Sequence, residues 1–186
     1  GPLARLNVCD AIPTPLANTE LREFRAYTNG KTNNHTMHSH WARLIELLHC
    51  AEAIRELLLD PDILGTDERP PINRRGEGVG VIEAPRGTLI HHYQADEKGS
   101  ITKCNLIVST THNNEPMNQA VRWVANNVLE GAKEIDDGLL NRFEVAIRAY
   151  DPCLSCATHA MGQMPLVVEL LDADGRLIAE RVREGA

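Results

Sequence analysis

The most informative stretch of this sequence is Asp151-Pro152-Cys153-Leu154-Ser155-Cys156-Ala157-Thr158-His159. It follows a predicted helix over residues 138–150 that Pro152 brings to an end. Two cysteines three positions apart, directly after such a helix end, can direct both sulfurs at one centre. Thiolates prefer soft or borderline metals such as nickel, zinc and iron. The stretch therefore indicates a metal or redox site.

Spacing alone leaves several chemistries open for this cysteine pair. Half of a structural zinc site, a redox dithiol and an iron–sulfur ligand pair all use two nearby cysteines. A zinc site needs about four ligands, and Cys153, Cys156 and His159 offer three. A thioredoxin-like pair would open a helix rather than close one. Haem attachment is excluded, because Ala157 and Thr158 separate the second cysteine from the histidine.

Upstream of this stretch, the pattern predicts an extended entry over residues 2–18, where prolines are frequent. A helix is expected over about 35–59, with apolar residues at three- and four-residue spacing. The Pro-rich segment 69–71 is expected to be a loop. The members of the expected apolar stripe are Trp41, Leu44, Ile45, Leu48, Ala51, Ile54 and Leu58.

Strands are expected next, at residues 79–82, 88–94 and 101–108, with a hairpin turn at 96–99. Helices follow over about 115–130 and 138–150. The tail has two apolar runs, 166–171 and 177–182, separated by the turn Asp172-Ala173-Asp174-Gly175. This order predicts a mixed α and β fold that is mainly helical, with a small antiparallel sheet and a C-terminal hairpin.

Composition limits the function. The 186 residues suit one domain, with 42% hydrophobic and 24% charged residues. The net charge of −7, with scattered basic residues, argues against nucleic-acid binding. No apolar run reaches the roughly 20 residues that span a bilayer. Five cysteines, of which only two are close together, favour a reducing cytoplasm over a disulfide framework.

Several segments together resemble the large subunits of NiFe-hydrogenases. The stretch 151–159 resembles their C-terminal signature, and Gly80-Val81-Ile82-Glu83-Ala84-Pro85-Arg86-Gly87 resembles the segment that carries an active-site arginine. Ile107-Val108-Ser109-Thr110-Thr111-His112-Asn113-Asn114 resembles a strand end over the iron ligands. Gly1-Pro2-Leu3-Ala4-Arg5-Leu6-Asn7 is also similar to a family segment. These matches follow the family's order across nearly the whole chain.

The finer resemblance is to the cytoplasmic, cofactor-coupled group of this family. Arg148-Ala149-Tyr150 and the Leu154-Ser155 pair between the cysteines look like the NAD-reducing and the methyl-viologen-reducing enzymes. The run of residues 110–114 favours the viologen-type branch. The electron acceptor implied is a NAD-reductase or heterodisulfide-reductase module.

The resemblance implies roles for individual residues. Cys153 would be a terminal nickel thiolate, and Cys156 would bridge nickel and iron. Arg86 would hold its guanidinium over the two metals. Pro85 and Thr110 would line the pocket of the iron's cyanide and carbonyl ligands. His159 would bind a structural magnesium or iron ion, with the backbone carbonyl of Leu106 as a further ligand of that ion.

Two features depart from the family pattern. The family's other thiolate pair lies in an N-terminal Arg-x-Cys-Gly-x-Cys type motif that does not occur here, so the chain holds two of the four nickel thiolates. We interpret it as a fragment, a truncation or one piece of a split subunit, exposing an apolar face. Mature subunits end at the histidine, yet 186 − 159 = 27 residues follow His159.

Residues 160–186 therefore resemble the extension that a maturation endopeptidase removes after His159, before Ala160. The resemblance implies that residues 1–159 are the C-terminal part of the large subunit and that the chain is its unprocessed precursor. The partners implied are a small subunit with iron–sulfur clusters and nickel-insertion proteins. A zinc-binding or assembly-state fragment is the alternative. The related quinone-reductase subunit of respiratory complex I fits less well, because it lacks the thiolates.

Some residues also have plain structural interpretations. Arg86, at a corner between strands, could pair with Glu83. Cys9, Cys50 and Cys104 are expected to be buried as small hydrophobic side chains. Trp41 and Trp123 are expected in the core.

Overall fold

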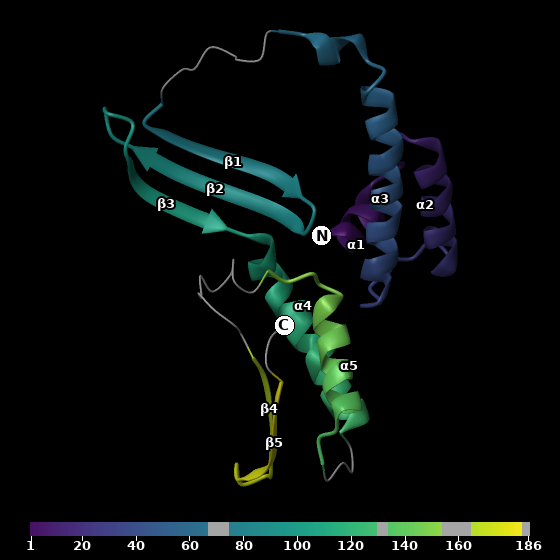
Figure 1. Cartoon of the computed structure of the whole chain (residues 1–186), viewed down its shortest axis with the longest axis vertical. Coiled ribbons are helices and arrows are strands. Elements are labelled where there is room, and N and C mark those ends of the chain that lie inside the picture. The colour runs from purple at the N-terminus through teal and green to yellow at the C-terminus, as the bar shows by residue number, and fades with distance from the viewer. Residues whose placement is uncertain (67–74, 130–133, 154–164, 184–186) are drawn as a thin grey trace. The chain divides into compact units, whose positions relative to one another are not determined.

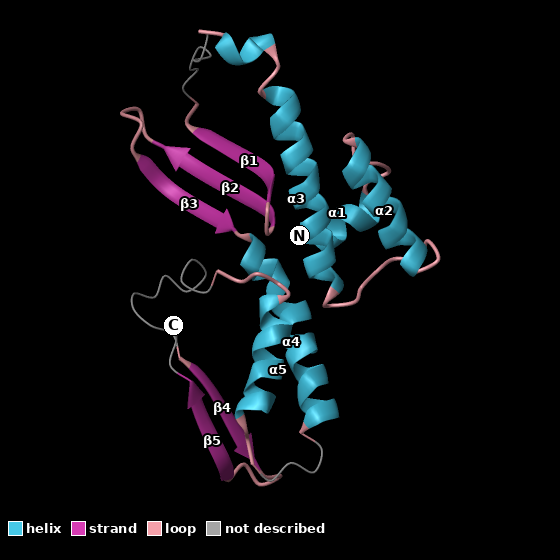
Figure 2. Cartoon of the chain, turned by 45° about the vertical axis from the view of Figure 1, so that its right-hand side comes forward, coloured by secondary structure: helices cyan, strands magenta, loops and turns pink. Residues whose placement is uncertain are grey.

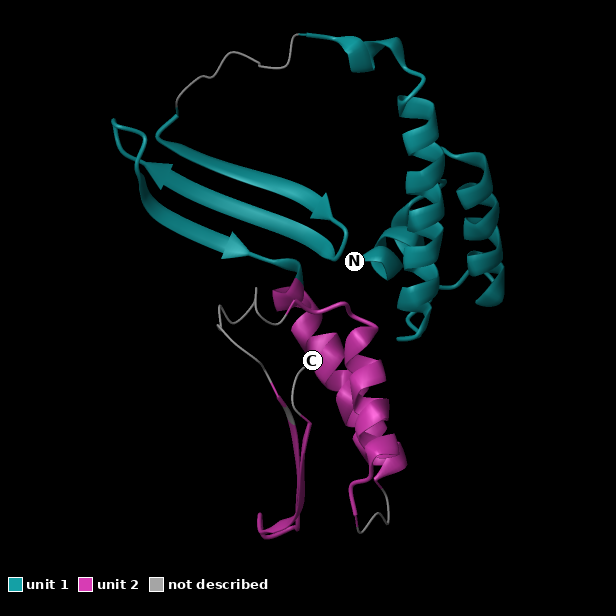
Figure 3. Ribbon diagram, viewed as in Figure 1, with its two compact units in different colours: residues 1–109 teal, residues 110–186 magenta. Residues whose placement is uncertain are grey.

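The computed structural model describes residues 1–66, 75–129, 134–153 and 165–183 (Figure 1). The chain divides into two compact units, Gly1–Ser109 and Thr110–Ala186 (Figure 3). The division into residues 1–159 and a C-terminal extension of residues 160–186, which the resemblance implies, stays a prediction. None of the helices in the described ranges is long and apolar enough to cross a membrane.

The first unit begins with three helices, α1 (Pro2–Val8), α2 (Pro15–Tyr27) and α3 (His38–Leu57), followed by the short 3-10 helix η1 (Pro61–Leu64). The extended entry predicted for residues 2–18 is wrong. Pro2 and Pro15 each stand at the start of a helix, where the missing N–H costs nothing and the fixed φ suits the helix. The predicted helix over 35–59 is confirmed as α3.

The core of the first unit lies where α1, α2 and α3 meet. Phe24 and Ala17 are fully buried. The ring of Trp41 packs edge-on against the ring of Phe24, with 5.2 Å between the ring centroids. The expected stripe of α3 is only partly buried: Ile45 is 2% exposed, whereas Leu44 is 63% exposed. The buried residues are Leu6, Ile12, Ala17, Leu21, Phe24, Ala42 and Ile45.

Exposed apolar side chains on α3 meet the expectation that this chain exposes an apolar face. Leu44, Leu47, Ile54 and Leu57 are all at least half exposed. A helix that is apolar on several sides is normally buried on several sides. The exposed side of α3 is therefore apolar as well as its buried side.

A three-stranded antiparallel sheet completes the first unit, with β1 (Glu77–Ala84), β2 (Gly87–Ala95) and β3 (Ile101–Ile107) in that order (Figure 2). The predicted strands and turn are confirmed. In the turn between β2 and β3, the Asp96 carboxylate accepts hydrogen bonds from the Lys98 and Ser100 amides, both at 2.9 Å. Gly99 has a φ of 85°, which glycine adopts without strain.

The second unit contains α4 (Ser109–Val128), α5 (Asp137–Arg148) and the hairpin of β4 (Leu166–Leu171) and β5 (Leu177–Arg183). The predicted hairpin and the predicted helix over 138–150 are confirmed. The helix expected over 115–130 begins six residues earlier, with Pro116 inside it. Residues 110–114 are therefore helical rather than the end of a strand.

The core of the second unit is formed by α4 and α5, and the hairpin packs on it. Leu140 is 1% exposed, and Glu144 of α5 pairs with Arg183 of β5 at 2.8 Å. The Asp136 side chain caps α5 by accepting a hydrogen bond from the Leu139 amide at 2.7 Å. The hairpin residues packed against the core are Val168, Leu170 and Ala179.

Three expected core residues lie on the surface instead. Trp123 is 64% exposed on α4, and Cys50 and Cys104 are exposed. Cys104 lies on β3, where every residue is exposed, so no second layer of the described residues covers it. Trp41 and Cys9 are partly buried and pack against the core of the first unit.

Candidate metal site

The turn that carries Pro85 and Arg86 joins β1 to β2. Both side chains are exposed, and the next residue, Gly87, is buried with a φ of 146°. A Cβ at Gly87 would lie 3.1 Å from the Gly1 nitrogen, so a side chain there would be both strained and crowded. The turn therefore packs directly against the start of α1.

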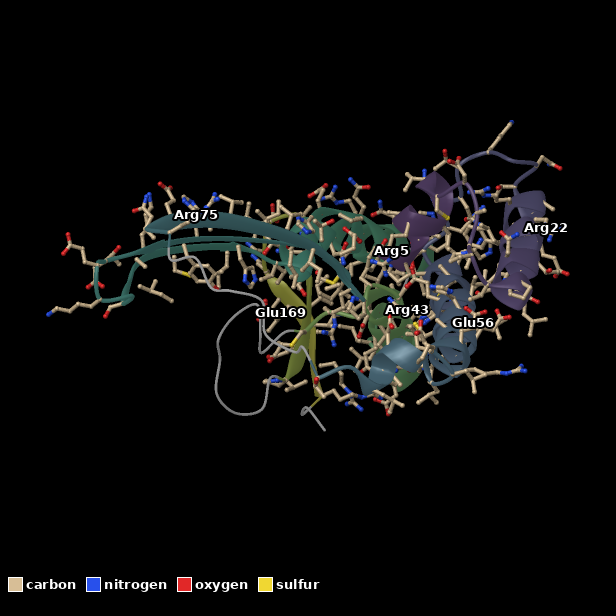
Figure 4. The ribbon with its side chains drawn as sticks, turned by 90° about the horizontal axis from the view of Figure 1, so that it is seen from above. Arg5, Arg22, Arg43, Glu56, Arg75 and Glu169 are labelled. Carbon is tan, nitrogen blue, oxygen red and sulfur yellow. The ribbon has the colours of Figure 1, made fainter. Side chains whose placement is uncertain are left out.

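Arg5 of α1, which is labelled in Figure 4, donates hydrogen bonds to this turn. Its guanidinium donates to the Glu46 carboxylate of α3 through Nε at 2.6 Å and through Nη2 at 2.7 Å. Nη1 donates to the Glu83 carboxylate and to the Ala84 carbonyl, both at 2.8 Å, and Nη2 donates to the Pro85 carbonyl at 2.9 Å. The planar fork of arginine suits this divergent set of acceptors.

The charges around this arginine shift the ionisation of their partners. The hydrogen bond with Glu46 is the main cause that raises the pKa of Arg5 above its ordinary value. The hydrogen bond from the Thr88 hydroxyl, followed by the one from Arg5, lowers the pKa of Glu83 below its ordinary value of 4.5. The structure bonds Glu83 to Arg5 and Thr88. The pairing of Glu83 with Arg86 stays a prediction.

We expect the Glu83 contacts to make stability depend on pH. A carboxylate whose pKa is lowered by folding contributes stability above its unfolded pKa, and this contribution is lost as pH falls through the lower folded pKa. Urea unfolding midpoints of the chain and of Glu83→Gln should therefore differ above pH 4.5 and converge below it. Glu97→Gln, in the exposed turn after β2, serves as the control. A difference that stays constant on acidification would contradict this assignment.

Leu106, the expected backbone ligand, lies near the end of β3. It is 44% exposed and pairs with His91 of β2 in the ladder. Pro85, Arg86 and Leu106 therefore all belong to the first unit.

Thr110 lies in the first turn of α4, where it is 7% exposed and follows the buried Ser109. It belongs to the second unit, as does Cys153, whereas Arg86 belongs to the first. The proximity of Thr110 and Cys153 to Arg86 therefore stays a prediction.

Cys153 follows the end of α5. The Asp151 amide donates to the Arg148 carbonyl at 3.0 Å, and Asp151 has a φ of 50°, in the left-handed region that non-glycine residues rarely adopt. Pro152 cannot continue the helix. Ala149 is fully buried, so the helix end that precedes Cys153 is anchored in the unit. The structure records Cys153 as disulfide-bonded, whereas metal ligation requires its thiolate.

The remaining predicted site residues, Cys156, His159 and Ala160, lie outside the described residues. Within the described ranges, no group of three or more histidine, cysteine or acidic side chains could hold a metal ion. The fit to a metal therefore rests on the donor chemistry of the two cysteines, which suits a soft or borderline metal.

Sequence reasoning did not single out Arg5 and Glu46 as parts of the site. Arg5 is part of segment 1–7, which is similar to a family segment, but nothing in the sequence indicates a separate role for it. No sequence pattern points to Glu46. Arg5 reaches partners 41 and 78–80 residues away in sequence, which local patterns do not reveal.

The chain belongs to the nickel-dependent hydrogenase family, which matches residues 1–159. Among its relatives, the beta subunit of the NAD-reducing hydrogenase HoxS of Cupriavidus necator is 62% identical over 98% of this chain. An iron-sulfur subunit of the F420-non-reducing hydrogenase of Archaeoglobus profundus is 47% identical over 96% of this chain. The chain spans 38% and 37% of the lengths of these two relatives, respectively.

A solved structure of an NAD+-reducing NiFe-hydrogenase in the H2-reduced state has the same fold. It superposes with a TM-score of 0.80 at 54% identity, over 86% of this chain and 35% of that chain. The predicted fold class, the C-terminal part of a NiFe-hydrogenase large subunit with a small antiparallel sheet, is thereby confirmed.

Proposed function

We propose that this chain is the C-terminal part of a catalytic large subunit that interconverts H2 with two protons and two electrons. The observation that carries the proposal is the Cys153-x-x-Cys156 pair in a chain of the nickel-dependent hydrogenase family. Because the chain spans little more than a third of its relatives, the activity belongs to the complete subunit.

In this proposal Cys153 and Cys156 would hold the nickel–iron group through their thiolates, Cys153 as a ligand of nickel and Cys156 as a ligand of both metals. A bound nickel–iron group supplies the Lewis acidity and redox capacity that H2 cleavage needs. Coordination would keep the Cys153 and Cys156 sulfurs deprotonated and basic, so either sulfur could accept a proton. Two further thiolates come from the part of the subunit that this sequence does not contain.

Arg86 is proposed to place its guanidinium over this site, where its fixed charge and donors stabilise developing negative charge. Pro85 and Thr110 are proposed to line the pocket for cyanide and carbonyl ligands on iron, with the Thr110 hydroxyl donating to a cyanide. The burial of Thr110 supports this role, because a buried hydroxyl needs a hydrogen-bond partner.

His159 and the Leu106 carbonyl are proposed to bind a structural magnesium or iron ion. A hard cation such as magnesium prefers oxygen ligands, which the Leu106 carbonyl provides. Leu106 lies near the end of β3, four residues before Thr110. In this proposal one segment, residues 106–110, therefore contributes both a ligand of the structural ion and Thr110.

Residues 160–186 are proposed to be a maturation extension cleaved between His159 and Ala160. The family match ends at His159, which supports this boundary. The β4–β5 hairpin packs on the core of the second unit through Val168, Leu170 and Ala179, and it bonds to α5 through the ion pair of Glu144 with Arg183. Since α5 leads directly to Cys153, a hairpin docked on it can hold that segment open until nickel arrives.

The partners proposed are a small subunit with iron–sulfur clusters, nickel-insertion proteins and a maturation endopeptidase, in the cytoplasm. Of the two electron acceptors considered, the NAD-reductase type is favoured. The relative that is 62% identical is NAD-reducing, whereas the F420-non-reducing relative is 47% identical. These identities weigh against the viologen-type branch that residues 110–114 favoured.

Metal analysis of the complete subunit tests this function. The subunit, co-expressed with its maturation proteins, should contain nickel and iron in near equal amounts and oxidise H2 with a redox dye as acceptor. Zinc alone would instead identify the cysteine pair as a structural zinc site and contradict the proposal. Incubation with the endopeptidase should then remove 27 residues, and an unchanged mass would reject the precursor assignment.

A further inference from the structure

Arg5 connects three segments that are far apart in sequence: α1, α3 and the turn between β1 and β2. The same guanidinium bonds the Glu46 carboxylate, the Glu83 carboxylate and the carbonyls of Ala84 and Pro85. The Arg5 and Glu46 side chains are only 24% and 25% exposed, so solvent competes weakly for this ion pair.

The two carbonyls that Arg5 binds belong to the residues directly before Arg86. The Pro85 carbonyl is part of the peptide that joins Pro85 to Arg86, so a bond to its oxygen restrains the Arg86 backbone. On the other side, a Cβ at Gly1 would lie 2.9 Å from the Arg86 carbonyl oxygen. The backbone on both sides of Arg86 is therefore held against α1.

We propose that Arg5 is a positioning residue for Arg86, which fixes the backbone from which the Arg86 guanidinium reaches the reacting centre. The proposal rests on the proposed function, in which Arg86 acts at the nickel–iron site. Arg5 itself acts only through the turn. Glu46 completes the arrangement, because it orients the guanidinium through two hydrogen bonds and balances its charge.

A lysine in place of Arg5 tests this role with its charge retained. A single ammonium lacks the planar fork that spans Glu46, Glu83 and the two carbonyls. In the assembled holoenzyme we expect Arg5→Lys to keep its nickel content and to exchange the amide hydrogens of residues 86–88 about tenfold faster. The kcat per nickel should fall about 10- to 100-fold, with little change in the KM for H2.

Arg25→Lys is the matched control. Arg25 of α2 also donates to backbone carbonyls of the same unit, those of Leu6, Cys9 and Asp10, but it does not bind the turn. This variant should leave both the exchange at residues 86–88 and kcat unchanged. Glu46→Gln keeps Arg5 and leaves one side-chain oxygen at residue 46 to accept its hydrogen bond. If Arg5→Lys does not assemble, the exchange rates and kcat of Glu46→Gln are compared with those of Arg25→Lys instead.

Unchanged exchange at residues 86–88 in the Arg5 variant would overturn the proposal, as would faster exchange with wild-type kcat. An equal fall in kcat for Arg25→Lys would also overturn it, because the effect would then be a general loss of stability. A wild-type complex without nickel or H2 oxidation would instead contradict the proposed function. The exchange rates would still decide whether Arg5 holds the turn.

Discussion

Replacing Cys153 with serine in the complete subunit is expected to abolish nickel binding and H2 oxidation. A serine hydroxyl stays protonated at neutral pH and is a hard donor, so it is a poor substitute for a thiolate on nickel. Loss of a residue that only supports a metal ligand costs about 10- to 100-fold in affinity or activity. Loss of a ligand itself should exceed that range. Metal analysis and dye-linked H2 oxidation measure the two effects.

Cys50→Ser is the matched control for this experiment, because Cys50 is an exposed free cysteine on α3. It should keep full nickel content and activity. Wild-type nickel content in Cys153→Ser would show that the metal is not bound through this sulfur. The result would leave the family assignment intact, since that rests on residues 1–159 as a whole.

Replacing Arg86 with lysine is expected to lower kcat by about 100- to 1000-fold, the usual cost of removing one preorganised donor from a reacting centre. Lysine keeps the positive charge but loses the rigid pair of donors. Nickel content should not change, because Arg86 is not a ligand. Parallel losses in kcat and in kcat/KM would indicate an interaction made in the transition state.

Arg22→Lys on α2 controls for the chemical change, since Arg22 is exposed and its only described bond is to the Asn18 carbonyl of its own helix. The control should retain wild-type kinetics. An active Arg86→Lys enzyme would remove Arg86 from the catalytic machinery. That result would also contradict the proposal that Arg5 supports catalysis by positioning Arg86.

Local patterns predicted the two hairpins and three of the long helices. The turn at residues 96–99 was found because Asp96 and Gly99 favour it through their own side-chain and backbone chemistry. The α5 helix was found because its apolar spacing is regular and Pro152 ends it. These features depend on residues a few positions apart, which a single sequence displays directly.

Other elements could not be predicted in this way. The prolines near the N-terminus predict an extended entry, whereas Pro2 and Pro15 begin helices; both outcomes are common for proline. The first residues of α4 lie in the segment 107–114, which resembles a strand end of the family, whereas the structure places them in a helix that includes Pro116. Trp123 was expected in the core because it is large and apolar, but its exposure depends on what else packs on α4.

The sequence by itself determined the family, because the resemblance depends on residue identity and spacing within short segments. Only the tertiary structure revealed that Arg5 joins Glu46 to the turn before Arg86, and that Glu144 pairs with Arg183 of the C-terminal hairpin. These contacts join residues that are 39 to 80 positions apart. Their partners are chosen by how helices and strands pack, and a single sequence does not record that choice.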